Sequence, residues 1–146
     1  MNPHETTDAF ELRLQTIFAD EARAHLAQID ASLAALAQAG AAAQAALVVT
    51  LQEALHTLKG AARAIGLGEL EYLCHALENV IAAAAVGGAM VAPAQLERIR
   101  PAVGMAGLLL APPPGRVRNQ AMALVGQLEA LARELAAPPS SPFPRI

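Results

Sequence analysis

The fold is decided by residues 51–68, LQEALHTLKGAARAIGLG. From Leu47 onward, apolar residues recur at intervals of four, four, three, four and three positions, namely Leu47, Leu51, Leu55, Leu58, Ala62 and Ile65. This spacing places them on one face of an amphipathic α-helix. Continued back to Gln44, the pattern predicts a helix over residues 44–65 that ends at Gly66, with only a very short turn after it.

The segment after this turn has the same spacing. Residues 69–86 are predicted to form a helix that Gly87-Gly88 stops. Its buried face is predicted to comprise Leu70, Leu73, Leu77, Val80, Ile81 and Ala84. Two helices joined by so short a turn are antiparallel neighbours.

Helices are also predicted near both ends of the chain. The first covers residues 8–39, with Thr7 or Asp8 as its cap and Gly40 as its stop. Its predicted apolar stripe comprises Phe10, Leu14, Ile17, Phe18, Leu26, Ile29, Leu33 and Leu36. The last helix covers residues 116–136.

Residues 93–111 show a weaker helical pattern. Pro93 suits a first-turn position, but Pro101 lacks a backbone donor in the middle of the segment. Gly104 and Gly107 lower the helix propensity of the second half of the segment. We therefore expect a kinked or broken helix in this segment.

Composition agrees with an all-α protein. The chain has 146 residues, of which 55% are hydrophobic but only 3% are aromatic. Much of the apolar content is alanine, the best helix former. We predict an up-down antiparallel four-helix bundle with a fifth, irregular or kinked, helix. Residues 1–137 are predicted to form this bundle, and residues 138–146 a Pro/Ser-rich tail or the start of a linker.

Several classes of protein do not fit. The net charge is −3, and no Lys/Arg cluster suggests a nucleic-acid partner. The single cysteine fits a reducing compartment. The polar N-terminus does not resemble a signal peptide, and glycine and proline interrupt the longest uncharged stretches. The sequence therefore predicts a cytoplasmic protein that does not enter a membrane.

The residues off the apolar stripe of the 44–65 helix suggest chemistry. Gln52, His56, Lys59, Gly60 and Arg63 share its opposite face, so His56 is expected to be exposed. A glycine inside a helix costs about 1 kcal/mol relative to alanine. Because the neighbouring residues are alanines, Gly60 is interpreted as a point where a partner or a phosphoryl group approaches the helix.

A carboxylate on the following helix is predicted to lie opposite His56. His56 lies about ten residues before the turn and Glu78 about ten after it, so both stand ~15 Å from the hairpin tip at 1.5 Å per residue. Glu78 can then orient the imidazole, with His75 one turn closer to the tip. Lys59 is expected to neutralise an incoming phosphoryl oxygen.

These motifs resemble a known family. The stretch from His56 to Ala62, followed by residues 65–67, is similar to the His-x-x-Lys-Gly signature of histidine phosphotransfer (HPt) domains. Residues 73–78, with His75 and Glu78, and residues 18–26 resemble the N-terminal phosphoacceptor domain of CheA-type chemotaxis histidine kinases.

The resemblance implies a function for the bundle. His56 would accept a phosphoryl group from a separate kinase catalytic domain, which uses ATP and Mg, and pass it to an aspartate of a response regulator receiver domain. It further implies that Glu78 orients His56, that Lys59 and His75 tune the site, and that Gly60 clears space.

A role in partner contact is predicted for Thr57, Gln52 and Arg63. The chain has no glycine-rich nucleotide loop and would not catalyse the ATP step alone. It would bind no cofactor itself and would belong to a larger histidine kinase.

Two other functions stay open at the level of sequence. The chain could be an HPt-shaped interaction module that carries no phosphate. It could also be a metal- or cofactor-binding bundle, although the usual metal and haem motifs are absent and no metal ligands are predicted.

Overall fold

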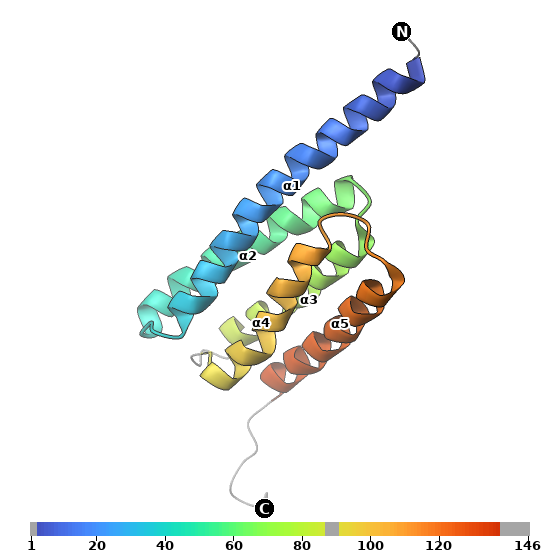
Figure 1. Cartoon of the computed structure of the whole chain (residues 1–146). Helices are drawn as coiled ribbons and strands as arrows, with labels where there is room; N and C mark the ends of the chain where they lie inside the picture. Colours follow the sequence, from blue (N-terminus) through green and yellow to red (C-terminus); the bar gives the residue numbers. More distant parts are fainter. Residues whose placement is uncertain (1–2, 87–90, 138–146) are drawn as a thin grey trace, which may run out of the picture.

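The computed structural model describes residues 3–86 and 91–137 as five helices (Figure 1). They are α1 (Pro3–Leu36), α2 (Ala41–Ala64), α3 (Gly68–Val86), α4 (Pro93–Leu108) and α5 (Gly115–Ala136). Within these residues there is no β-strand, so the all-α prediction is confirmed.

The helices form a closed bundle with one helix added outside. α1 packs against α2 and α4, α2 packs against α3, and α3 contacts α4. α5 lies along α3 and α4 (Figure 1). The predicted four-helix bundle is therefore α1–α4, and the fifth helix is the regular α5.

Leucine and isoleucine side chains fill the centre of the bundle. Ile29 and Leu33 of α1, Leu55 of α2, Ile81 of α3 and Ile99 of α4 are all buried. The predicted apolar face of α3 is buried throughout. On α2 the face is also buried, except that Leu47 and Ile65 are only partly covered.

The turn between α2 and α3 is built around Gly66, whose φ is +78°. The amide of Leu67 donates to the carbonyl of Ala62 at 2.9 Å, and the amide of Gly66 donates to that of Arg63 at 3.3 Å. These two bonds define a Schellman motif, in which glycine takes the left-handed conformation at little cost. The motif reverses the direction of the chain within residues 65–67, and α3 begins at Gly68.

The ends of α1 differ from the prediction. The helix begins at Pro3, so Thr7 and Asp8 lie inside it and do not cap it. It ends at Leu36, and Gly40 is the N-cap residue of α2 with an extended ψ of 175°. The chain therefore turns over residues 37–40, and α1 ends before residue 39, where the prediction placed its end.

Of the kinked or broken helix predicted over residues 93–111, the break is wrong, because α4 is one helix that continues through Pro101. Pro101 is exposed, so the carbonyl of Glu97 that loses its partner can be hydrated. Buried residues on both sides of the proline, Leu96, Ile99, Val103 and Ala106, hold the two halves on the same core.

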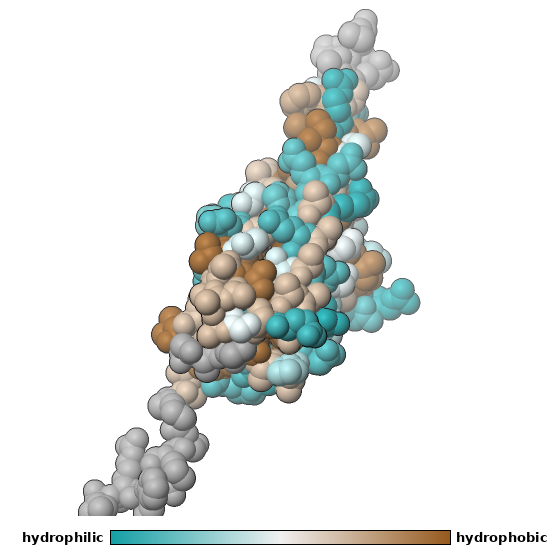
Figure 2. Space-filling model, turned by 90° about the vertical axis from the view of Figure 1, so that its left-hand side faces the viewer, coloured by the Kyte–Doolittle hydropathy of each residue, from teal (hydrophilic) through white to brown (hydrophobic). Residues whose placement is uncertain are grey.

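The N-terminal part of α1 extends past the rest of the bundle (Figure 1). Its predicted stripe is not buried there, since Phe10, Leu14 and Ile17 are exposed and burial begins at Phe18. Figure 2 shows hydrophobic residues at the surface of this projecting end. The predicted apolar stripe covers both halves of α1, but only the half from Phe18 onward packs against other helices.

Gln44 joins three parts of the chain at the opposite end of α1. Its buried amide nitrogen donates to the carbonyl of Leu36 at 2.9 Å, and its oxygen accepts from the amide of Val91 at 3.0 Å. The side chain therefore satisfies the last turn of α1 and the segment before α4 at the same time.

Some predictions concern residues outside the described ranges. Gly87-Gly88 and the tail over residues 138–146 are among them, and the division at residue 137 stays a prediction. None of the described helices has the length and apolar content that a membrane crossing requires.

Candidate functional site

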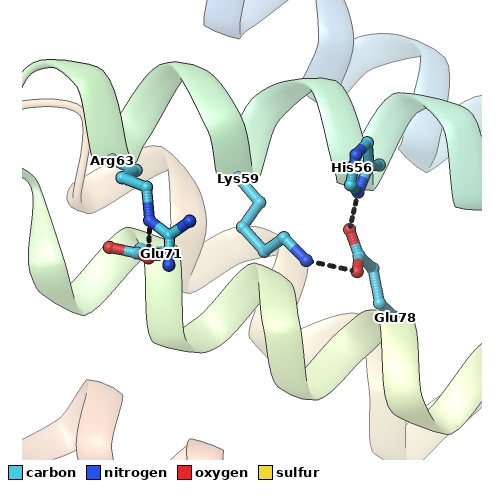
Figure 3. A network of polar contacts seen from close by, with 5 residues as sticks. All are labelled: His56, Lys59, Arg63, Glu71 and Glu78. Carbon is cyan, nitrogen blue, oxygen red and sulfur yellow. Dashed lines mark hydrogen bonds and ion pairs between the residues drawn. The ribbon is translucent and has the colours of Figure 1, made fainter.

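α2 and α3 bring three of the predicted residues together (Figure 3). The Nδ1 atom of His56 lies 3.4 Å from the Oε1 atom of Glu78, and the Nζ atom of Lys59 lies 2.8 Å from Oε2 of the same carboxylate. His56 and Lys59 are one turn apart on α2, so both reach across to the same position on α3.

Burial differs sharply within this group. The side chain of His56 is 76% exposed, whereas those of Glu78 and Lys59 are 18% and 22% exposed. The carboxylate thus lies beneath the imidazole. Nδ1 faces the protein and the opposite side of the ring is open to solvent.

The contact between His56 and Glu78 is longer than an ordinary hydrogen bond. Oε1 is fully buried and accepts no hydrogen bond from the described residues. Since the imidazole is exposed and can turn, a small rotation brings Nδ1–H to this oxygen. Catalytic hydrogen bonds are often long in the free protein and shorten in the reacting complex.

Lys59 is placed differently from the expectation. Its ammonium donates to Glu78 and is not directed at solvent beside His56. A lysine side chain is long enough to choose between these positions, and the buried carboxylate offers the stronger partner.

His75 is not drawn into the network. It is exposed on α3, one turn before Glu78, and forms no hydrogen bond or ion pair with residues 3–86 or 91–137. Its predicted tuning role stays a prediction.

The four predicted partner-contact residues surround the site. Gly60 and Thr57 are exposed, and a Cβ added at Gly60 would meet nothing within 4 Å. Packing inside the bundle therefore does not require a glycine at this position. The guanidinium of Arg63 pairs with Glu71 at 2.8 Å, and Gln52 is half-buried (Figure 3).

An open depression of about 390 Å³ adjoins His56 on the side away from Lys59. It is lined by Gln52, Glu53, His56, Glu78, Asn79 and Ala82. Sequence reasoning missed Glu53 and Asn79. The signal for Glu53 was its position three residues before His56, which places it on the same side of the helix.

Cys74 lies one turn before Glu78 on the inner side of α3 and is fully buried. Burial, with a further contribution from the charge of Glu78, raises the pKa of this thiol to about 12. The thiol is therefore neutral near pH 7 and packs as a small buried hydrophobe.

No group of three or more His, Cys, Asp or Glu side chains in the described residues is arranged to hold a metal ion. The arrangement that is present, an exposed imidazole backed by a buried carboxylate on a helical bundle, is suited to phosphoryl transfer through histidine.

Comparison with known families agrees with this class. The family model for the Hpt domain matches residues 13–137, and the chain therefore belongs to the Hpt, or histidine phosphotransfer, family. Membership implies phosphotransfer in two-component signalling. Comparison with curated proteins and with solved structures gave no match.

Proposed function

We propose that His56 is the phosphoacceptor of a chemotaxis-type two-component pathway. It takes a phosphoryl group from the ATP-binding domain of a histidine kinase and gives it to an aspartate of a response regulator receiver domain. The observation that carries the proposal is the buried Glu78 carboxylate, which faces Nδ1 of an otherwise exposed imidazole.

The carboxylate selects the reactive nitrogen. An ionised carboxylate only accepts hydrogen bonds, so it favours the tautomer with the proton on Nδ1. Nε2 then keeps its lone pair, on the exposed side of the ring. This nitrogen attacks the γ-phosphorus of ATP held by the kinase domain, the bond from that phosphorus to the bridging oxygen breaks, and ADP leaves.

In the second step, the imidazole is the leaving group instead of the nucleophile. A carboxylate oxygen of the receiver aspartate attacks the phosphorus, and the electron pair of the N–P bond returns to Nε2. Mg bound by the kinase and by the receiver supplies charge neutralisation in the two steps. This chain contributes a positioned nucleophile that projects from a rigid helix.

Neighbouring residues support these steps. Lys59 holds the second oxygen of Glu78 and so fixes the plane of the carboxylate. The open space at Gly60 and the exposed Thr57 let a partner surface approach α2 closely. Arg63 and Gln52 lie on either side of this approach, and His75 tunes the site from α3.

Support for a chemotaxis-type pathway comes from the spacing of His75 and Glu78 on α3. This His-x-x-Glu pair, together with residues 18–26 of α1, resembles the phosphoacceptor domain of CheA-type kinases. Both stretches lie within residues 13–137, which the Hpt family model matches.

The test is transfer of label from γ-³²P-ATP in the presence of an isolated ATP-binding domain of a CheA-type kinase. We expect wild-type protein to gain label that is lost in acid and kept in alkali, as for a phosphoramidate. His56→Gln should gain none.

His25→Gln is the matched control, because His25 lies on α1 and takes no part in the site. It should be labelled as wild type. Label that persists in His56→Gln, or label that is stable in acid, would contradict the proposal.

A further inference from the structure

Not every charged side chain near His56 is paired with an opposite charge. Lys59 pairs with Glu78, and Arg63 pairs with Glu71, so both cations of α2 near the site are neutralised by carboxylates of α3. Glu53 is exposed and forms no ion pair or hydrogen bond with the part of the chain that the structure describes. The surroundings of His56 thus carry one negative charge in excess.

Glu53 is also close to the reacting group. It lies three residues before His56, where side chains of a helix are neighbours about 5–6 Å apart at Cβ. Both residues line the same open depression. Lys59 stands at the corresponding position three residues after His56, but its ammonium lies on Glu78.

We propose that Glu53 sets the phosphoryl-transfer potential of His56. This inference rests on the proposed function, because it requires His56 to carry the phosphoryl group. The group brings about two negative charges next to an uncompensated carboxylate, and the repulsion destabilises the phosphorylated state relative to the free imidazole. Glu53 therefore favours donation to an acceptor over retention of the phosphoryl group.

The test uses a small phosphodonor, so that no partner protein is needed. With potassium phosphoramidate, the Nε2–P bond forms as the P–N bond of the donor breaks. The amine leaves as ammonium, taking the acidic proton of the donor and the proton that the imidazole releases. The forward rate with phosphoramidate and the reverse rate with excess ammonium, both followed by ³¹P NMR, give the equilibrium constant.

Glu53→Gln should increase this equilibrium constant by about 3- to 10-fold at low salt. The ratio to wild type should fall toward one at 1 M salt, where the Debye length is about 3 Å. The control is Glu97→Gln, which removes the same charge from an exposed position on α4, the helix diagonally opposite α2 in the bundle. It should match wild type at every salt concentration.

Two outcomes would overturn the inference, namely an equilibrium constant of Glu53→Gln equal to that of Glu97→Gln, or a change that salt does not reduce. Circular dichroism checks that both variants are folded. If wild-type His56 takes no phosphoryl group from phosphoramidate, the proposed function fails as well. If it does and Glu53→Gln changes nothing, only the role of Glu53 is lost.

Discussion

The carboxylate of Glu78 lies between two side chains of α2, with one oxygen near His56 and the other on Lys59. Each oxygen serves a different side chain of α2. A neutral side chain of the same shape cannot serve both. The imidazole needs an acceptor at Nδ1, and the ammonium needs a counter-charge in a half-buried position.

Glu78→Gln should therefore slow phosphorylation of His56. A hydrogen bond to a charged group contributes about 1.5–3 kcal/mol, so the rate of labelling should fall by about 10- to 100-fold. Glu71→Gln is the matched control on α3, because Glu71 pairs with Arg63 and lies away from His56. Equal rates for the two variants, measured with the same phosphodonor, would remove Glu78 from the mechanism.

Cys74 makes stability depend on pH at the alkaline end. The pKa of the thiol is raised from 9.0 to about 12 by burial, so the folded state keeps a proton that the unfolded chain loses. The stabilisation is complete below pH 9 and is lost as the pH rises from about 9 to about 12.

Cys74→Ala isolates this contribution. The difference in free energy of unfolding between wild type and Cys74→Ala should shrink as the pH rises through this window, when both are measured by urea denaturation. A difference that is constant from pH 8 to pH 11 would contradict the assignment. Because burial also shields the thiol, it should react with a thiol reagent only after the protein is unfolded.

At the scale of elements, the two halves of α1 differ in their contacts. Phe18 is buried in the hydrophobic core, whereas Phe10 lies on the projecting end and is 57% exposed. The two residues share a helix and a side-chain type, which makes them a matched pair.

Phe18→Ala should lower the free energy of unfolding by about 3–5 kcal/mol, because it leaves a cavity in a packed core. Phe10→Ala should lower it by less than about 1 kcal/mol, since the residue buries little area. Urea denaturation measures both. Similar losses for the two variants would mean that the projecting half of α1 packs against the bundle.

The same contrast shows how far the sequence could predict the fold and the site. Spacing identified the apolar faces of α2 and α3, and the short turn fixed the height at which Glu78 meets His56. Spacing could not show that Phe10, Leu14 and Ile17 stay exposed, because that depends on the lengths of α2 and α4. It also could not show that Lys59 would choose Glu78, since a flexible side chain selects its partner only in three dimensions.

α4 shows a related limit of prediction from local sequence. Pro101 was predicted to kink or break the helix, from the cost of proline in a helix interior. The structure places it on the exposed side, where water can satisfy the freed carbonyl, and buried residues on either side continue the helix. Whether a proline breaks a helix thus depends on burial, which the local pattern did not reveal.

At the scale of the whole molecule, Gln44 connects helices through hydrogen bonds that the spacing of apolar residues does not predict. Its amide group bonds to Leu36 and to Val91, so α1, α2 and the approach to α4 are fixed at one end of the bundle.

Gln44→Leu should lower the free energy of unfolding by about 2–4 kcal/mol, because a buried carbonyl and a buried amide both lose their partners. The amide of Val91 should then exchange with solvent faster than in wild type. Gln52→Leu is the control, since Gln52 is half-buried and forms no hydrogen bond within residues 3–86 and 91–137. Unchanged exchange at Val91 in Gln44→Leu would show that this bond does not hold the segment.

The Schellman turn at Gly66 also has a kinetic consequence. It joins the two helices of the site through residues 65–67 alone, and closing a short loop costs little conformational entropy. Contacts that are local in sequence form early in folding. The hairpin of α2 and α3 can therefore assemble before α5 docks, so that the phosphoacceptor geometry does not depend on the last helix.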